Sequence, residues 1–366
     1  MSVPFAPETF AQITDRFSMS QFFTKIYTTR SKRPSLKAIV LQSKISPELL
    51  NDIIIKRPDL DDFKIDVVKL SSDLYRISLT RKIGEGIFNG IFLLDISNYG
   101  SWVVLTNASN YYVNHVIESF YDKLYPKISR IYFNLEQMEK FVNIIKDEYG
   151  GKSTFRGFTI IRNKRVWKLG NEKYSSGTFN LWEENAEEEI KKQSLDYNIK
   201  IIRLNFSIKD KYDFILLRAN ISRKGKCSLL YGDFNNYYYN VILKIIDYGI
   251  TWREFYSERE RSLINNEILL NPFSITYPEK INMIDLKKLS KHINNIYSCS
   301  IIHNGNPYFV ANIGDYQEGS SFGVTVLGNT VTITPITKGT VEATWKLTEV
   351  VQQVLGDGLI SNINKI

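Results

Sequence analysis

Two stretches of equal length decide the fold: ISNYGSWVVLTNASNYYVNHVI at residues 96–117 and ISRKGKCSLLYGDFNNYYYNVI at residues 221–242. They align without a gap at an offset of 125, and 8 of the 22 positions are identical. The identical pairs are Ile96/Ile221, Ser97/Ser222, Gly100/Gly225, Leu105/Leu230, Asn110/Asn235, Tyr112/Tyr237, Val116/Val241 and Ile117/Ile242. A repeat indicates one structural unit used more than once. We therefore predict an internal duplication at about 96–125 and 221–250.

Each copy reads as strand, glycine turn, strand and helix. The helix of the first copy has apolar residues at a spacing of three and four, which is typical of one buried stripe. These residues are Val113, Val116, Ile117, Phe120, Tyr121 and Leu124. The second copy places Tyr238, Val241, Ile242, Ile245 and Ile246 at the equivalent positions. We expect the side chains of Asn110 and Asn235 to cap the two helices.

The composition fits a folded protein with large cores. The chain has 366 residues, of which 43% are hydrophobic and 13% aromatic, so we expect two or three domains and little disorder. Its longest apolar runs are too short to cross a bilayer, and its N-terminus lacks a signal-peptide pattern. Two cysteines cannot form a disulfide framework. We therefore expect a cytoplasmic protein that does not act at a membrane.

The pattern of elements predicts an α+β fold of antiparallel β-meanders, each flanked by helices, in serial units. We divide the chain into an N-terminal arm (1–35), a first α+β unit (36–150), a second α+β unit with a basic hairpin (151–272) and a C-terminal α+β unit (273–366). The order of elements resembles that of the saddle-shaped binders of double-stranded DNA of the TATA-binding type. This resemblance concerns the fold alone and implies no particular site residues.

Positive charge is concentrated in two windows. The chain has a formal net charge of +8, and the windows 17–37 and 151–174 carry +5 and +6, so the remainder sums to −3. A focused excess of positive charge is what a binding surface for a polyanion requires.

The second window contains a predicted hairpin at 153–169, where cations alternate with aromatic rings. Cations bind phosphates, and rings stack on bases. A further candidate is the turn between the two strands of the second copy, where three cations replace the uncharged turn of the first copy. The predicted phosphate contacts are Arg30, Lys32, Arg33, Arg156, Arg162, Lys164, Arg165, Lys168, Arg223, Lys224 and Lys226.

No motif indicates a catalytic or metal centre. The three histidines, His115, His292 and His303, lack the spacing of metal ligands. The segment from Gly84 to Gly90 resembles the glycine-rich loop of protein kinases, but the other kinase motifs are missing, so we interpret it as a β-turn. Asp62-Phe63-Lys64 has the Asp-x-Lys spacing of restriction-type nucleases. We expect no metal site, no catalytic residues and no cofactor.

These observations favour a non-enzymatic subunit that binds nucleic acid, or assists assembly, in a cytosolic prokaryotic complex. Antiphage defence is one candidate setting. Two alternatives remain open. The first is a protein-interaction subunit whose basic surface binds an acidic partner, and the second is a metal-dependent nuclease built around Asp62.

Overall fold

The chain forms two compact units in a computed structural model, Met1–Asp247 and Tyr248–Ile366. The structure describes residues 10–29, 35–98, 100–149, 152–162, 178–181, 199–210, 212, 214–260, 262–264, 267–305 and 308–362. The first two α+β units predicted from the sequence share one β-sheet within the first compact unit.

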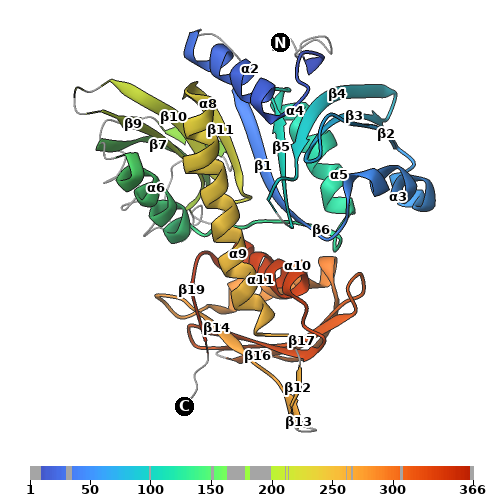
Figure 1. Cartoon of the computed structure of the whole chain (residues 1–366). Helices are drawn as coiled ribbons and strands as arrows, with labels where there is room; N and C mark the ends of the chain where they lie inside the picture. The colour runs from blue at the N-terminus through green and yellow to red at the C-terminus, as the bar shows by residue number, and fades with distance from the viewer. Residues whose placement is uncertain are drawn as a thin grey trace. The chain divides into compact units, whose positions relative to one another are not determined.

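The first compact unit is built on one antiparallel sheet, which has eleven strands among the described residues (Figure 1). The strand order is β2-β3-β4-β5-β1-β11-β10-β9-β7-β8, and β6 pairs with β1. Its strands are β1 (Leu36–Ser43), β2 (Phe63–Lys69), β3 (Leu74–Ile83), β4 (Gly86–Asp95), β5 (Ser101–Thr106), β6 (Ile128–Arg130), β7 (Lys152–Arg162), β8 (Thr178–Leu181), β9 (Ile199–Lys209), β10 (Ile215–Ser222) and β11 (Lys226–Gly232).

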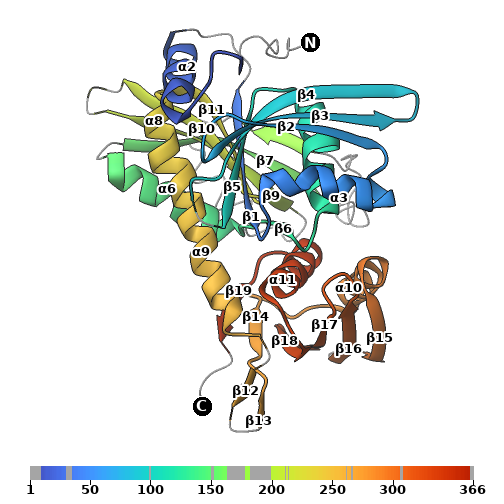
Figure 2. The same cartoon turned by 45° about the vertical axis from the view of Figure 1, so that its right-hand side comes forward.

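Short helices connect these strands. The helices of this unit are α2 (Arg16–Thr29), α3 (Leu50–Lys56), α4 (Asn110–Tyr112), α5 (Glu118–Lys123), α6 (Leu135–Tyr149) and α8 (Phe234–Tyr237), with 3₁₀ turns at Pro47–Leu49 and Pro58–Leu60. Helix α9 (Leu243–Ser257) begins in this unit and continues into the second. In Figure 2, α2 lies near the junction of the two halves of the sheet. None of the described helices combines the length and the apolar composition that crossing a bilayer requires.

Strand β1 joins the two repeats. It pairs with β5 along one edge, and along the other edge it pairs with β11 and then with β6. All eight residues of β1 are buried. β5 and β11 are equivalent strands of the two copies, and both run antiparallel to β1. The copies are therefore related approximately by a half-turn about the axis of β1.

This half-turn places the covering helices of the two copies on opposite faces of the sheet. Ile39 of β1 pairs with Val104 of β5 and with Lys226 of β11, so these side chains share a face. Ile39 and Val104 belong to the core beneath α5. We call this face the α5 face.

The opposite face carries Ala38 of β1 and its pairing partner Cys227 of β11. The sulfur of Cys227 lies 2.9 Å from the hydroxyl oxygen of Tyr237 in α8. Helix α2 packs against α8 on the same side, where the rings of Phe23 and Phe234 lie 5.1 Å apart. We call this face the α2 face.

The duplication is visible in the backbone as well as in the sequence. Gly100 and Gly225 occupy the same turn position with φ of 72° and 64°. A wide π-helical turn occurs at Val113–Ile117 in the first copy and at Tyr238–Ile242 in the second, again 125 residues apart. Such turns are rare, so their common position supports a shared origin. The predicted α+β class with an internal duplication is confirmed.

The predicted helix caps are wrong. Ser109, and not Asn110, accepts the capping hydrogen bond from the amide of Tyr112 at 3.2 Å. In the second copy Asp233, and not Asn235, accepts it from the amide of Asn236 at 2.8 Å. Serine and aspartate are equally good caps, and each asparagine instead lies inside the first helical turn.

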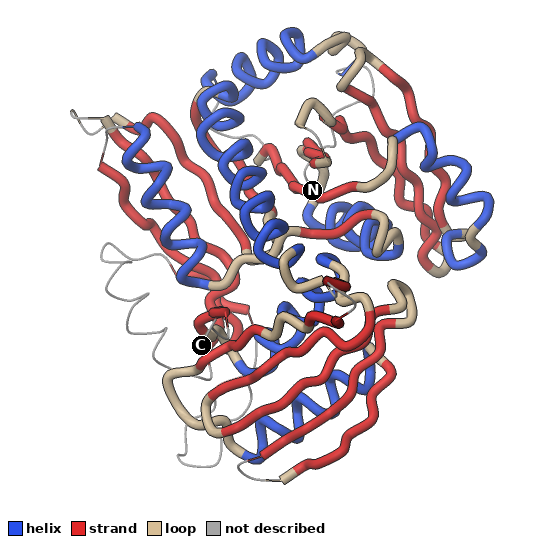
Figure 3. The backbone as a smooth tube through the Cα atoms, turned by 60° about the horizontal axis from the view of Figure 1, so that its bottom comes forward, coloured by secondary structure: helices blue, strands red, loops and turns tan. Residues whose placement is uncertain are grey.

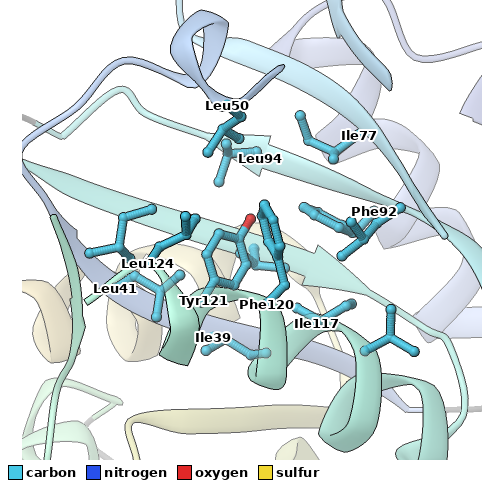
Figure 4. Close-up of a cluster of buried hydrophobic side chains, with 14 of the residues drawn as sticks. Ile39, Leu41, Leu50, Ile77, Phe92, Leu94, Ile117, Phe120, Tyr121 and Leu124 are labelled. Carbon is cyan, nitrogen blue, oxygen red and sulfur yellow. The ribbon is translucent and has the colours of Figure 1, made fainter. Parts of the chain in front are cut away.

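The core of the first half lies between β1–β5 and the helices on the α5 face (Figure 4). The predicted helical stripe supplies Ile117, Phe120 and Tyr121, which are buried against strand residues such as Phe92. The rings of Phe92 and Tyr121 meet edge to face with centroids 6.2 Å apart. Burying side chains of this size contributes about 1.5–3 kcal/mol each, which fixes the position of the meander β2–β4.

The second compact unit repeats the same order of elements around a sheet of six strands (Figure 3). Its elements are β14 (Phe273–Thr276), α10 (Met283–Ile296), β15 (Ser298–Asn304), β16 (Tyr308–Asp315), β17 (Ser320–Leu327), β18 (Thr330–Thr337), α11 (Val341–Leu355) and β19 (Leu359–Asn362), preceded by the strand pair β12 (Ser262–Ile264) and β13 (Glu267–Leu269). The order β15-β16-β17-β18-β14 matches β2-β3-β4-β5-β1 of the first unit. The prediction of a third helix-flanked meander is therefore confirmed.

Candidate nucleic-acid interface

Most of the predicted phosphate contacts cannot be placed. Arg30, Lys32, Arg33, Lys164, Arg165 and Lys168 lie outside the described residues. Arg156 and Arg162 belong to β7, whose backbone alone is described. The register between β7 and β9 shifts between Phe155 and Gly157, so Arg156 lies at an irregularity of the strand. The predicted turn of the hairpin also lies outside the described residues.

The prediction that the turn of the second copy displays three cations is wrong for two of them. Arg223 and Lys226 are buried, with 5% and 8% of their surface exposed. The amine of Lys226 donates to Asn114 at 2.9 Å and pairs with Glu118 at 3.1 Å. The guanidinium of Arg223 donates to the carbonyl of Ile201. These two cations are occupied inside the protein and are not displayed at a turn tip.

The reason is that the turn packs against another part of the same unit. The amide of Phe133 donates to the carbonyl of Arg223 at 2.6 Å, and Gly225 approaches Ile131 closely enough that a Cβ would lie 3.1 Å from its carbonyl oxygen. Lys224 is the one cation of this predicted set that the structure shows exposed.

A different cationic surface lies on the α2 face of the first half, over β2, β3 and β4. Side chains alternate along β3: Tyr75, Ile77 and Leu79 are buried beneath the helices of the α5 face, so the residues between them point to the other side. The pairing of β3 with β2 and β4 places the partners of these residues on the same side of the sheet. The resulting surface, which we call the open face, carries the polar residues Lys64, Asp66, Arg76, Ser78, Thr80, Lys82 and Asn89, with the apolar Val68, Ile87 and Ile91 between them.

The open face has an excess of unpaired positive charge. It carries three cations, Lys64, Arg76 and Lys82, and one acid, Asp66. Lys64 and Lys82 are exposed, and Arg76 is half-buried. Among the described residues, none of the three cations forms a hydrogen bond or an ion pair. The neighbouring hydroxyls of Ser78 and Thr80 are partly exposed and add neutral donors.

The spacing of these cations suits a linear polyanion. Arg76 and Lys82 lie on one strand, six residues apart, which corresponds to about 20 Å. Lys64 pairs in register with Thr80, between the two. Phosphates recur along a nucleic-acid strand at a spacing of a few ångströms, so the open face is long enough to contact several consecutive phosphates of one strand.

A groove lies on the same side of the sheet as the open face. It has a volume of about 550 Å³ and lies between α2 and α8. The rings of Phe17 and Tyr239, which are 72% and 56% exposed, contribute to its lining. Arg16 also lines it and contacts Asp95 of β4 at 3.3 Å. Asp95 pairs with Leu74, two residues from Arg76, so Arg16 joins the lining of the groove to the strands that carry the open face.

The wall of this groove is held by a buried network. The hydroxyl of Tyr238 donates to Asp95 at 2.7 Å, and the guanidinium of Arg16 lies 4.6 Å from the centre of the Tyr238 ring. Burial, followed by the neighbouring carboxylate of Asp95, raises the pKa of Tyr238. The phenol therefore stays protonated and keeps Arg16 in place.

The second compact unit offers an internal comparison. The uncovered side of its meander carries residues such as Asn312, Thr325 and Thr332, and the described residues of this surface include no lysine or arginine. The same architecture therefore exists without surface cations. The cations of the open face are not a requirement of the fold.

Nothing in the described chain supports the nuclease alternative. Asp62 pairs with Arg81 at 2.7 Å and with Lys123 at 3.1 Å, on the helix-covered side of β2. Lys64 of the same triplet lies on the open face. Within the described ranges, no three His, Cys, Asp or Glu side chains are grouped so that they could hold a metal ion.

Comparisons with known proteins find no relative: no family model matches the chain, and no curated protein is significantly similar to it.

The cations of the open face do not stand out when charge is summed over windows of the sequence, because they lie on two separate strands. Polar and apolar residues alternate with the period of a strand from Arg76 to Thr80, and Lys82 lies two residues further on the polar side. Lys64 and Arg76 lie outside both charged windows, and each is separated from Lys82 in the sequence.

Proposed function

We propose that the protein binds nucleic acid without catalysis, mainly through contacts to the phosphate backbone on the open face. The observation that carries this proposal is the presence of Lys64, Arg76 and Lys82, all unpaired among the described residues, on one uncovered sheet surface. Contacts from lysine and arginine to phosphates supply most of the affinity in sequence-independent binding.

The groove on the same side of the sheet as the open face supports the same proposal. Exposed rings next to cations are typical of surfaces on which bases stack while phosphates follow a charged track. Phe17 and Tyr239 would accept unpaired bases, and Lys64, Arg76 and Lys82 would bind the backbone. This arrangement favours single-stranded nucleic acid over a regular duplex, because bases in a duplex are not available for stacking. Lys224 adds an exposed cation whose part in binding stays a prediction, as does assembly within a prokaryotic complex.

Removal of the three cations tests the proposal. In the full-length protein, the variant Lys64→Ala/Arg76→Ala/Lys82→Ala should bind a fluorescent 20-nucleotide single strand about 10- to 100-fold more weakly than the wild type at 0.1 M salt. Fluorescence anisotropy measures this affinity. The three side chains are exposed or half-buried, so the variant should fold like the wild type.

A matched control removes three cations from the second compact unit. Lys280, Lys287 and Lys291 are exposed and unpaired among the described residues. Their replacement by alanine changes the net charge by the same amount and should leave the affinity within about threefold of the wild type. Equal losses in both triple variants would contradict the open face as the contact surface. Binding of an acidic protein but of no nucleic acid would instead favour the protein-interaction alternative.

A further inference from the structure

A row of polar side chains crosses the α5 face where the two copies meet. The register places Asn205 of β9, Asn220 of β10, Ser228 of β11, Lys37 of β1 and Thr106 of β5 side by side on five consecutive strands. The opposite face of the same strands is apolar, as the cores of sheets normally are. We call these five residues the polar row.

The polar row is buried, and two of its members have partners: the amine of Lys37 donates to the carbonyl of Ala108 at 2.7 Å, and the hydroxyl of Thr106 accepts from the amide of Ala108 at 3.1 Å. Asn205, Asn220 and Ser228 are 6%, 8% and 5% exposed. Their side chains form no hydrogen bond with any other described residue. Carboxamide and hydroxyl groups that form no hydrogen bond within the protein are free to donate to a ligand.

Positive charge gathers at the same place. Arg203 of β9 lies two residues from Asn205 on this face, and Lys226 of β11 lies two residues from Ser228. Together with Lys37 they give three cations. Glu118 of α5 is the acid that faces them among the described residues, and it pairs with Lys226 at 3.1 Å. Arg130 and Asp122 beside Glu118 pair with each other at 2.6 Å, so the cluster keeps an excess of about two positive charges.

The charges repel one another. Burial, with the nearby cations Lys226 and Arg203, lowers the pKa of Lys37 to about 8. Burial also lowers the pKa of Lys226 and of Arg203, against the opposing effect of Glu118. An anion bound beside Lys37, Arg203 and Lys226 would stabilise their charged forms.

A fourth cation lies at the edge of the same face. Arg218 of β10 pairs in register with Ser207, in the next row beyond Asn220. Its Nε atom is buried and has no hydrogen-bond partner. Arg203 likewise forms no hydrogen bond or ion pair with the described residues, and both arginines are partly exposed, so they give the polar row an edge that solvent reaches.

We propose that the polar row, with Arg203 and Arg218, is a binding site for a phosphate-class anion, either free phosphate or the phosphate of a small ligand. The guanidinium groups of the arginines and the amine of Lys37 supply charge-assisted donors. The amides of Asn205 and Asn220 and the hydroxyl of Ser228 supply neutral donors. The site lies on the opposite face of the sheet from the open face and does not depend on nucleic-acid binding.

The test is thermal unfolding of the full-length protein in increasing inorganic phosphate, with potassium chloride at equal ionic strength as the reference. Phosphate should raise the midpoint of unfolding in a saturable manner, because a ligand that binds only the folded state stabilises it. The half-saturating concentration should fall as the pH is lowered from 9 to 7, because Lys37 regains its proton in this range. A midpoint equal in phosphate and chloride overturns the proposal.

Two variants show whether the effect arises at this site. Arg203→Gln removes a partly exposed cation and should raise the half-saturating phosphate concentration at least tenfold. Asn220→Asp places a carboxylate among the cations. It should raise the midpoint without phosphate and abolish the response to phosphate. A polar row with a purely structural role would instead be destabilised by a buried carboxylate and would respond to phosphate like the wild type.

Adenosine triphosphate and adenosine distinguish the two sources of phosphate. Saturation by the triphosphate at a lower concentration than by inorganic phosphate assigns the site to a phosphorylated ligand, and the reverse order assigns it to the free anion. Adenosine alone should have no effect, and an equal response to it would overturn the proposal. The triple variant of Lys64, Arg76 and Lys82 should keep the full response, which separates this site from the proposed function.

Discussion

Replacement of Glu118 by glutamine should destabilise the protein strongly, because Glu118 links the two copies. Its carboxylate lies 2.7 Å from Arg130 and 3.1 Å from Lys226, and these side chains are only 15%, 11% and 10% exposed. Glu118 belongs to the helix of the first copy, and Lys226 begins the last strand of the second. Breaking a buried pair leaves charges without compensation, which costs about 3–5 kcal/mol.

Urea unfolding at pH 7 measures this loss. We expect the free energy of unfolding of Glu118→Gln to be lower than that of the wild type by about 3 kcal/mol, the lower end of that range, because glutamine keeps the shape and can still accept hydrogen bonds. Adding Lys226→Met should recover part of the loss, since no unpaired amine then remains. The matched control is Glu136→Gln, whose exposed pair with Lys140 at 2.7 Å should contribute less than about 0.5 kcal/mol.

The same pair predicts a dependence on pH. Burial opposes ionisation of Glu118, but Arg130 and Lys226 outweigh it and hold its pKa below the ordinary value. The stabilisation is therefore complete above the unfolded pKa of about 4.3 and is lost as the pH falls through the lower folded value. If Glu118→Gln lowered the free energy of unfolding by less than about 1 kcal/mol at pH 7, solvent would be screening these charges, and the buried ion pairs would not link the two copies.

The remaining predictions concern single side chains. Gly225→Ala should lower the free energy of unfolding by about 1–2 kcal/mol in urea titrations, because φ is 64° there; a neutral effect would show that the turn tolerates a side chain. Stability of the wild type should rise between pH 8 and 10.5, by about 3 kcal/mol at most, because the unfolded chain binds the proton of Lys37 more tightly; Lys37→Met should remove this rise. Cys227 is fully buried and burial raises its pKa to about 12, so a thiol reagent should modify only Cys299 in the native protein; rapid labelling of both would contradict this.

The sequence predicts best the features that occur in both copies of the repeat. The glycine at position 100 and its counterpart at 225 share a left-handed conformation, and the helical stripe from Val113 to Tyr121 is buried as predicted. Both features depend on local spacing, which the sequence records directly. The third meander could also be predicted, although its residues match the others poorly, because strand and helix periods do not require identity.

Features that depend on tertiary contacts could not be predicted. Arg223 and Lys226 follow a turn pattern that usually lies at the surface, but the half-turn about β1 brings them against Phe133 and Glu118. No pattern within residues 221–226 indicates the contacts with Phe133 and Glu118. The polar row is likewise assembled from five strands whose order along the sheet differs from their order in the chain.

The salt dependence of nucleic-acid binding shows whether the open face binds phosphates. The logarithm of the binding constant of the wild type should fall linearly with the logarithm of the salt concentration, with a contribution of about 0.7 to the slope per phosphate contact on a single strand. Loss of Lys64, Arg76 and Lys82 should reduce the slope by about 2, and loss of Lys280, Lys287 and Lys291 should not change it. A slope that is the same in all three proteins would contradict the open face as the phosphate-binding surface.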